Sequence, residues 1–435
     1  MTTTVGAKKP MSIRKIALAS LVGTTIEWYD FFIYGTAAAL VFGTAFFPTF
    51  DATAGTLAAF ATFAVGFIAR PIGGLLGGHF GDKIGRKAML VTTLLITGLS
   101  TFLVGLLPTY EQIGFAAPIL LVVLRFLQGV GVGGEWGGAV LVAVEHAPEN
   151  RRGFYGSFPQ LGVGVGLSLG TILFAALGTL PDDAFQAWGW RIPFLLSLLL
   201  VVFGFIIRAR VEETPAFKEM KANNVVQRMP VVEVLKKYPG QILRGFMIST
   251  VAILIFFIVT VFTLSYATTE LRVARNTILI AIIVVTIAEL ITLPAWAALS
   301  DKIGRRPVFL IGAVFTAAFA WPYFWLIGTG NTAAIFVAFL AIWLVGHAAT
   351  YGASASFLIE MFPPEMRYSG ASISYQLASI VAGGFTPIIA TALLAWSGGQ
   401  TWSVAAYLFA GAALSAVGAL MAKETMTRKR TKPLP

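Results

Sequence analysis

Long apolar segments recur along the whole chain, and they constrain its fold more than any other sequence feature. A helix needs about 20 mostly apolar residues to cross a bilayer, and about twelve such segments are present. Because 57% of the residues are hydrophobic and only 12% are charged, the composition is that of a membrane protein rather than a soluble domain. With boundaries accurate to a few residues, the segments are expected at 16–42, 53–79, 88–107, 117–145, 154–178, 188–208, 241–267, 276–299, 308–328, 333–359, 370–396 and 402–422.

The placement of the 31 Lys and Arg residues indicates the orientation of the chain. If the N-terminus is cytoplasmic, the loops on that side hold most of them, whereas the outer loops hold only Arg272 and Arg275. This asymmetry is the positive-inside pattern. We therefore expect a multi-pass protein of the cytoplasmic (inner) membrane with both termini in the cytoplasm. The net charge of +11 then reflects topology, and no nucleic-acid partner is expected.

The two halves of the chain repeat one another. GDKIGRK (81–87) after the second segment returns as SDKIGRR (300–306) after the eighth, and E-x-x-P-x-x-x-R follows both the fourth and the tenth segments. Two helical bundles related by a pseudo-two-fold axis, with a site between them, are typical of secondary transporters. We expect an N-terminal six-helix bundle at 1–207, a cytoplasmic linker at 208–240 and a C-terminal six-helix bundle with a short basic tail at 241–435.

The first of these turns is similar to a signature of the major facilitator superfamily, G-x-x-x-D-x-x-G-R-K. The residues that fill it are Gly78, Asp82, Gly85, Arg86 and Lys87. More narrowly, the chain resembles the metabolite:proton symporter family, and within it the shikimate-permease-like branch, over nearly its whole length. The segments that carry this resemblance are EWYDFFIYG (27–35), RFLQGVGVGGEWGGA (125–139), GWRIPF (189–194), EMFPPEMRYSG (360–370) and GGFTP (383–387). The resemblance implies an all-α membrane protein with twelve transmembrane helices in two pseudo-symmetric six-helix bundles.

Ionisable side chains inside membrane spans are costly, so each one is a candidate for function. Asp30 lies at mid-depth in the first span, with Glu27 on the same helix face, and Arg125 lies in the fourth span. Asp30 and Arg125 are expected to meet across the N-terminal bundle, and the superfamily's sugar carriers have an Asp and an Arg that match these positions. If a substrate carboxylate draws Arg125 away, Asp30 loses its counterion and takes up a proton.

The alternative for Asp30 and Arg125 is a fixed ion pair that only holds the bundle together, although such buried pairs are weak stabilisers. Glu135, a further candidate for proton coupling, is explained equally well by packing against Gly-rich backbone. Glu289, at mid-depth in the eighth span, is assigned more readily to a hydrogen-bonded packing role than to the cavity.

Polar side chains at the depth of a central cavity are candidates for substrate binding. For Tyr34, Gln160, Tyr375 and Gln376, each taken singly, hydrogen bonding between helices is the favoured alternative. For His347, substrate contact or proton relay is as well supported as packing. The candidates are Arg125, Gln128, Trp136, Tyr34, Gln160, His347, Tyr351, Tyr375 and Gln376.

Charged residues at the cytoplasmic ends of the repeated spans are predicted to form ion pairs that close the inner mouth as a gate. The alternative is that the cations only signal topology, but acidic residues at matching repeat positions favour the gate. The predicted gate residues are Asp82, Arg86, Glu145, Arg152, Asp301, Arg305, Glu360 and Arg367.

The sequence indicates a transporter and not an enzyme. It has no P-loop, no cysteine and only three scattered histidines, so no cofactor and no metal site are expected. We expect a monomeric proton-coupled symporter that imports a small organic acid anion, an aromatic or alicyclic monocarboxylate, by alternating access. Its partners are then this substrate, the proton and the lipid bilayer. The alternatives are a proton-coupled carrier of a zwitterionic osmolyte such as proline or betaine, and a non-transporting membrane sensor on the same fold.

Overall fold

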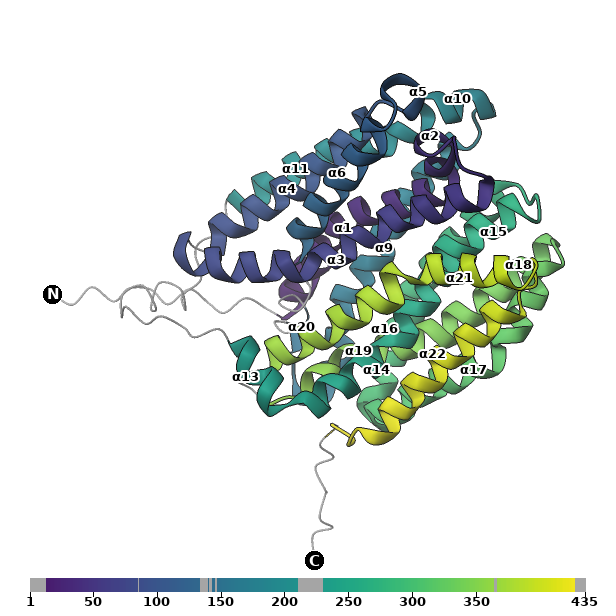
Figure 1. Ribbon diagram of the computed structural model, residues 1–435. Helices are drawn as coiled ribbons and strands as arrows, with labels where there is room; N and C mark the ends of the chain where they lie inside the picture. Colours follow the sequence, from purple (N-terminus) through teal and green to yellow (C-terminus); the bar gives the residue numbers. More distant parts are fainter. Residues whose placement is uncertain are drawn as a thin grey trace, which may run out of the picture.

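The computed structural model describes residues 13–84, 86–133, 140, 143–144, 147–209, 230–363 and 366–426. Its regular elements are all helices, with no strand in the described part of the chain (Figure 1). Among these residues, nine helical stretches are long and apolar enough to cross a membrane, and three shorter apolar helices accompany them: Val91–Leu106, Ala116–Val132 and Gly189–Val202. Each predicted segment overlaps one of these stretches, which confirms the all-α membrane fold.

The N-terminal bundle is drawn in purple to teal in Figure 1. Its tightest packing joins α1 to α9, α4 to α11 and α3 to α6. The elements are α1 (Ile13–Ala37), η1 (Ala38–Phe42), α2 (Gly43–Phe46), α3 (Ala52–Ile84), α4 (Arg86–Leu106), α5 (Tyr110–Ile113), α6 (Ala116–Val132), η2 (Glu149–Arg151), α8 (Arg152–Gly156), α9 (Phe158–Leu177), α10 (Asp182–Ala187), η3 (Gly189–Arg191) and α11 (Ile192–Ala209).

The C-terminal bundle is drawn in green to yellow, and α22 packs against both α14 and α17 within it. Much of the predicted linker, 208–240, lies outside the described residues, so its bounds stay a prediction. The elements are α13 (Pro230–Lys237), α14 (Pro239–Phe257), η4 (Ile258–Phe262), α15 (Thr263–Thr269), α16 (Arg275–Ile303), α17 (Arg305–Gly328), α18 (Thr332–Ala341), η5 (Ile342–His347), α19 (Ala348–Glu360), α20 (Arg367–Ala378), η7 (Ser379–Gly384), α21 (Thr386–Trp396) and α22 (Trp402–Met421).

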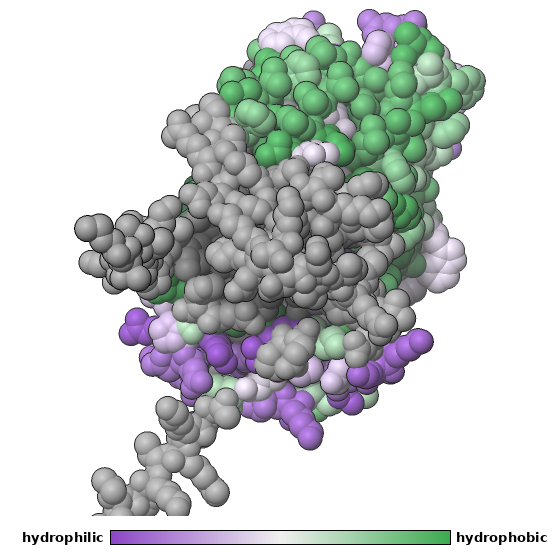
Figure 2. Space-filling view, turned by 90° about the vertical axis from the view of Figure 1, so that its left-hand side faces the viewer, coloured by the Kyte–Doolittle hydropathy of each residue, from purple (hydrophilic) through white to green (hydrophobic). Residues whose placement is uncertain are grey.

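The outer surface of the bundles is apolar, as a lipid-facing surface must be. Figure 2 shows hydrophobic residues over the upper part of one face and hydrophilic residues along its lower edge. Large side chains such as Ile291, Trp325 and Trp396 are more than 70% exposed. A soluble protein rarely exposes so much contiguous apolar surface, so these side chains face the acyl chains.

The two bundles meet along two pairs of helices. α9 packs along α16, and α3 packs against η7 and α21. A hydrogen bond of 2.7 Å from Ser168 to Thr286 crosses the first of these contacts, and one of 3.5 Å from Gln160 to Ser354 joins α9 to α19. The segments η1, η4, η5 and η7 are π-helical, and they interrupt the first, seventh, tenth and eleventh spans. Short π segments often occur at functional sites.

Glycines allow helices of the N-terminal bundle to approach until their backbones touch. A Cβ atom on Gly129 of α6 would collide with the carbonyl oxygen of Gly66 and lie 2.8 Å from the Cβ of Ala69 in α3. A Cβ on Gly166 of α9 would lie 2.7 Å from the carbonyl oxygen of Thr25 in α1. Small residues at such crossings are the usual means of helix association in lipid.

We expect Gly129→Ala to destabilise the N-terminal bundle, because α6 must move away from α3 to admit the new methyl group. Overpacking of this kind costs about 1–3 kcal/mol. The midpoint of thermal unfolding in detergent should fall. Gly328→Ala is a suitable control, because a Cβ at Gly328 meets no atom within 4 Å. Equal midpoints for the two variants would show that the crossing of α3 and α6 tolerates a larger separation.

Candidate functional site

Arg125 lies at the centre of a buried cluster in the N-terminal bundle and is fully shielded from solvent. Its Nη1 donates to the Oε1 of Gln128, and its Nε donates to the carbonyl oxygen of Phe63 at 3.4 Å. The guanidinium carbon lies 4.2 Å, 4.1 Å and 4.7 Å from the ring centres of Phe31, Tyr34 and Phe63. Desolvated cation–π contacts of this kind contribute about 2 kcal/mol each. Aromatic rings and an amide therefore stabilise this cation, and no described carboxylate pairs with it.

The close approach of α3 makes room for this arginine. A Cβ atom on Gly66 would lie 2.5 Å from the Nε and 2.9 Å from the Cζ of Arg125. The tight crossing of α3 and α6 thus sets the position of the guanidinium group as well as the packing of the bundle.

Asp30 approaches the same cluster from α1 without contacting Arg125. The Nε2 of Gln128 donates to the backbone oxygen of Asp30 at 3.2 Å and to the Oγ1 of Thr101 at 2.7 Å. The Asp30 carboxyl group is buried, and its Oδ1 has no hydrogen-bond partner. Both side chains are described, and the predicted direct contact between Asp30 and Arg125 is absent from this conformation. Gln128 bridges the two residues instead, by accepting from Arg125 and donating to the backbone oxygen of Asp30. The aromatic rings around the guanidinium group stabilise it in this position.

Arg70 is a second buried cation, which the sequence reasoning did not assign to the site. Its guanidinium carbon lies 4.4 Å from the ring centre of Phe31, 4.5 Å from that of Phe67 and 5.2 Å from that of Trp28. The ring of Phe31 therefore contacts both Arg70 and Arg125. In the sequence, only the position of Arg70 within an apolar segment indicated a role in the site. That position does not show whether the side chain points into the bundle.

A cavity of about 20 Å³ lies between the two bundles. The predicted residues His347, Tyr351 and Tyr375 line its C-terminal side, whereas Gln376 does not line it. The space holds roughly one water molecule, so an organic solute requires the cavity to widen. The other lining residues are Trp28, Phe32, Phe67, Val163, Ala252, Ile253, Phe256, Phe257 and Ser379. The walls are predominantly aromatic and aliphatic.

His347 belongs to a second polar cluster, which is in the C-terminal bundle. Its Nδ1 lies 2.8 Å from the Oε1 of Glu289, and the Nε1 of Trp343 donates to the Oε2 of Glu289 at 2.9 Å. The rings of His347 and Trp343 stack with their centres 4.6 Å apart. These hydrogen bonds fit the packing role that the sequence favoured for Glu289. Its partner His347, however, is itself a candidate for substrate contact or proton relay.

The remaining predicted binding residues take part in contacts between helices. The hydroxyl of Tyr34 donates to the Oγ1 of Thr62 at 2.8 Å. Gln160 contacts Ser354 across the bundle interface. Trp136 and Glu135, as well as the side chain of Glu27, lie outside the described part of the structure.

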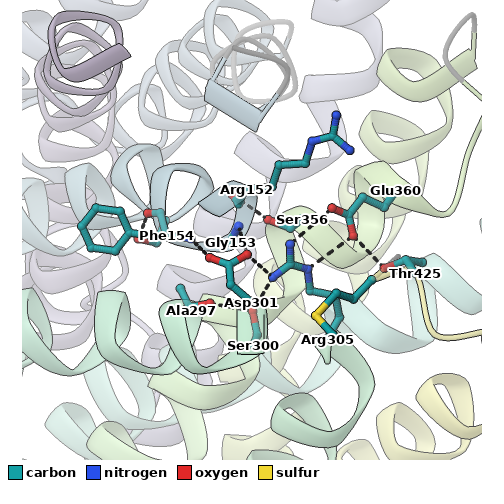
Figure 3. A network of polar contacts seen from close by, with 12 residues as sticks. Arg152, Gly153, Phe154, Ala297, Ser300, Asp301, Arg305, Ser356, Glu360 and Thr425 are labelled. Atoms are coloured by element: carbon teal, nitrogen blue, oxygen red, sulfur yellow. Dashed lines mark hydrogen bonds and ion pairs between the residues drawn. The ribbon is translucent and has the colours of Figure 1, made fainter. Parts of the chain in front are cut away.

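A charged network closes the end of the bundles where α16 meets α17 (Figure 3). The Nη1 of Arg305 lies 2.6 Å from the Oδ1 of Asp301, and its Nε and Nη2 each donate to Glu360 at 3.3 Å. The Asp301 carboxylate also accepts the backbone N–H groups of Gly153 and Phe154 at 2.8 Å and 2.9 Å. Because α8 belongs to the N-terminal bundle, the network, called here the Asp301 network, joins both halves of the molecule.

The described C-terminal segment also contacts the Asp301 network. Glu424 accepts the backbone N–H groups of Arg305 and Arg306 at 3.0 Å each, and so caps the first turn of α17. The Oγ1 of Thr425 donates to the Oε2 of Glu360 at 2.7 Å. The sequence repeat indicated only residues at the ends of the repeated spans. It therefore did not predict the contacts of Glu424 and Thr425.

The other predicted gate residues are placed differently. Arg152 enters the interface through its backbone oxygen, which accepts a 3.0 Å hydrogen bond from Ser356. The Nε of Arg367 donates to the carbonyl oxygen of Phe362. Glu145 and the side chains of Asp82 and Arg86 lie outside the described residues, so their part in the gate stays a prediction.

A depression of about 610 Å³ lies between the bundles at the opposite end of α16. The Nη1 of Arg275, the first residue of α16, lies 2.9 Å from the Oδ1 of Asp182 in the N-terminal bundle. Its Nη2 donates to the carbonyl oxygens of Gly178 and Leu180 at 3.1 Å and 3.3 Å. Asp182 is largely exposed, so this ion pair is weak.

Two helical bundles with a cavity between them and a buried polar cluster in each are an arrangement typical of secondary transporters. Residues 15–242 match the family described as "Sugar (and other) transporter", and residues 245–434 match the Major Facilitator Superfamily. The chain belongs to the Major Facilitator Superfamily, and within it to the metabolite symporters of the shikimate-transporter-like branch. It is a transporter and not an enzyme.

Several relatives resemble the chain over nearly its whole length. The shikimate transporter of Escherichia coli K12 is 43% identical over 417 residues, which cover 95% of each chain. The inner membrane metabolite transport protein YhjE of the same organism is 41% identical over 420 residues, again 95% of each chain. The proline/betaine transporter of E. coli K12 is 36% identical over 426 residues, or 96% of this chain and 84% of that protein. The xylose transporter XylE from E. coli, in a partially occluded inward-open conformation, shares the fold with a TM-score of 0.74 at 20% identity, over 96% of this chain and 99% of that chain.

We expect Asp301→Asn to open the end of the bundles that the Asp301 network closes. The amide cannot neutralise Arg305, and it cannot accept from both backbone N–H groups. Removal of one partner from a buried pair costs about 3 kcal/mol, or a roughly hundredfold shift in equilibrium. The chain has no cysteine, so Ser354→Cys provides a single thiol behind the network.

The rate at which a maleimide labels this thiol should rise in Asp301→Asn. Glu270→Gln, which removes an exposed charge at the other end of the bundles, should leave the rate unchanged. Equal labelling rates in Asp301→Asn and in the protein that retains Asp301 would show that the network does not hold the bundles together.

Proposed function

We propose that the protein is a proton-coupled symporter that imports a small organic acid anion, an aromatic or alicyclic monocarboxylate, by alternating access. The observation that carries this proposal is the buried guanidinium of Arg125, which has no carboxylate partner among the described residues and whose Nη2 makes no hydrogen bond. A buried cation with an unsatisfied N–H group is costly, and a substrate carboxylate would satisfy it through a charge-assisted hydrogen bond. The name of the shikimate transporter supports a ring compound with one carboxylate.

The walls of the cavity support the choice of a ring substrate. Trp28, Phe32 and Phe67 face it from the N-terminal bundle, and Phe256 and Tyr351 face it from the C-terminal bundle. Flat apolar faces bind an aromatic or alicyclic ring, while a few polar groups orient it. Arg70 contacts Phe67 of this wall, and Arg125 contacts Phe31, which packs against Phe67, so the carboxylate would enter on the side of the N-terminal bundle.

Asp30 is proposed as the group that carries the proton. A carboxylate without a cationic partner is expensive to bury, so the present arrangement suits a protonated Asp30. In the loaded carrier, the substrate anion neutralises Arg125, and the proton neutralises Asp30. Arg125, Asp30 and the substrate then carry no net charge together, so the bundles can move around them within the membrane. After release, Arg125 would pair with the ionised Asp30, whose backbone oxygen already shares Gln128 with the guanidinium group.

The two ends of the molecule are proposed as alternating gates. The positive-inside pattern supports a cytoplasmic position for the Asp301 network and for both termini. The Arg275–Asp182 contact would then lie at the outer mouth, beside the depression of about 610 Å³. A weak outer contact and a buried inner network fit a resting state in which the inner mouth is closed.

Transport of a zwitterion is the second candidate function, and the proline/betaine transporter supports it. Its carboxylate would bind Arg125 in the same way. Its ammonium group, however, would approach two buried cations that already share the ring of Phe31. This repulsion favours an anion over a zwitterion. A membrane sensor on this fold would bind its ligand without moving it across the membrane. Measured uptake therefore distinguishes a transporter from a sensor.

Uptake into proteoliposomes tests the symport. We expect a panel of ring monocarboxylates, including shikimate and benzoate, to accumulate when the lumen is alkaline relative to the medium, and a protonophore to abolish the accumulation. Proline and glycine betaine, tested in parallel, should not accumulate. Accumulation that depends on sodium, or that survives the protonophore, would exclude proton symport.

Asp30→Asn tests the proton carrier. The amide resembles the protonated carboxyl group in shape, so exchange of labelled for unlabelled substrate should continue. Accumulation driven by a pH gradient should be lost, because the empty carrier can no longer release a proton. Asp183→Asn, the same change at an exposed position, should behave like the original protein. Retention of pH-driven accumulation in Asp30→Asn would assign the proton to another group.

A further inference from the structure

The cluster of Glu289 and His347 has the composition of a titratable site, and it is independent of Asp30. Glu289 lies midway along α16, and His347 ends the π segment η5. Their side chains are 5% and 2% exposed, and the Oε1–Nδ1 distance is 2.8 Å. The second carboxylate oxygen accepts from Trp343, so both oxygens of Glu289 have partners. A carboxylate and an imidazole in this arrangement hold or release one proton between them.

The cluster lies where the two bundles touch, and it also reaches the cavity. His347 lines the cavity between the bundles. A Cβ atom on Gly164 of α9 would lie 3.3 Å from the Oε2 of Glu289, so α9 of the N-terminal bundle passes close to this carboxylate. One helical turn from Glu289, the Ser168–Thr286 hydrogen bond crosses the same interface. Any movement of one bundle against the other therefore changes the surroundings of Glu289.

No other charge in the described part of these helices faces the cluster at this depth. Phe256 of α14 and Tyr351 of α19 lie against the imidazole, with ring centres 5.8 Å and 5.0 Å away, and Tyr375 lines the same cavity. α9 and α18 contain no Asp, Glu, Lys or Arg. The charged residues of the other helices that pack here lie towards their ends: Arg244, Arg275, Asp301, Lys302, Arg305, Arg306 and Glu360.

We propose that the Glu289–His347 pair is a second proton site, so that two protons enter with each substrate anion. This inference rests on the proposed symport. In the loaded carrier, His347 is an imidazolium beside the Glu289 carboxylate, and the pair has no net charge. On the cytoplasmic side the imidazole loses one proton to water and becomes neutral. The pair is then left with one negative charge, which hydration stabilises during release and which the empty carrier takes back to the outer side.

The position of the pair explains how release is coupled to movement. In the loaded carrier, α9 lies against Glu289 and limits the access of water to the protonated pair. When the bundles separate, Glu289 and His347 become hydrated together with the substrate site. One monoanion and two protons carry one net positive charge inwards, whereas one monoanion and one proton carry none. The second site therefore predicts electrogenic transport.

The test is the response of uptake to membrane potential in proteoliposomes, with a ring monocarboxylate that the original protein transports. A potassium diffusion potential, negative inside, should stimulate uptake by the original protein at equal pH on both sides. Glu289→Gln and His347→Gln should lose this stimulation but still accumulate substrate in response to a pH gradient. The number of protons per substrate, from the gradients at zero flux, should fall from two to one.

A second variant separates protonation from packing. Thr286→Val removes the hydrogen bond to Ser168 on the same face of α16 and leaves the Glu289–His347 pair intact, so it should keep both the stimulation by potential and the ratio of two. Loss of stimulation in Thr286→Val would assign the effect to packing and overturn the proposal.

Electroneutral uptake by the original protein, or unchanged stimulation in Glu289→Gln, would also overturn the second site while leaving pH-driven symport intact. Absence of any response to a pH gradient would instead remove the proposed symport itself.

Discussion

The cost of placing a charge in a membrane is the constraint on which the rest of this structure depends. The molecule meets that cost in three different ways. Arg305 pairs with two carboxylates at the end of the bundles. Glu289 is matched with an imidazole and an indole N–H group. Arg125 has only aromatic rings, an amide and a backbone oxygen, so its charge is the least compensated of the three. Arg125 is therefore the buried charge most suited to bind a substrate anion reversibly.

The two bundles differ in the charges that they bring to their shared interface. The N-terminal bundle contributes Arg70 and Arg125 behind an aromatic layer, and the C-terminal bundle contributes Glu289 and His347. The sequence repeats are clearest at the ends of the spans, where both halves have D-K-I-G-R turns. Symmetry is thus retained in the parts that are proposed as gates. The parts that would bind solutes have diverged, as a carrier with one asymmetric substrate requires.

Sequence reasoning predicted what depends on one helix or on a repeated pattern. Hydropathy located the spans, and the repeat pointed to Asp301, Arg305 and Glu360, which the structure brings together. It did not find contacts that depend on how helices pack. Glu289 and His347 are 58 positions apart, and no periodicity relates them. The same limit applies to Asp30 and Arg125, because spacing places both at mid-depth but cannot show that Gln128 lies between them.

The packing of the bundles determines what kind of movement can open the site. Glycines bring α3 against α6 and α1 against α9 until backbones touch, so these pairs cannot bend or slide without collisions. The bundles meet each other through aromatic contacts such as the stacked Phe32–Phe256 pair, a few hydrogen bonds, the Asp301 network and the Arg275–Asp182 pair. Two units that are each close-packed internally favour rigid-body rotation over deformation. Because the cavity holds roughly one water molecule, rotation of the bundles is also the simplest way to admit a ring-sized solute. The same rotation would uncover Glu289 and the substrate site together, since both lie between the bundles.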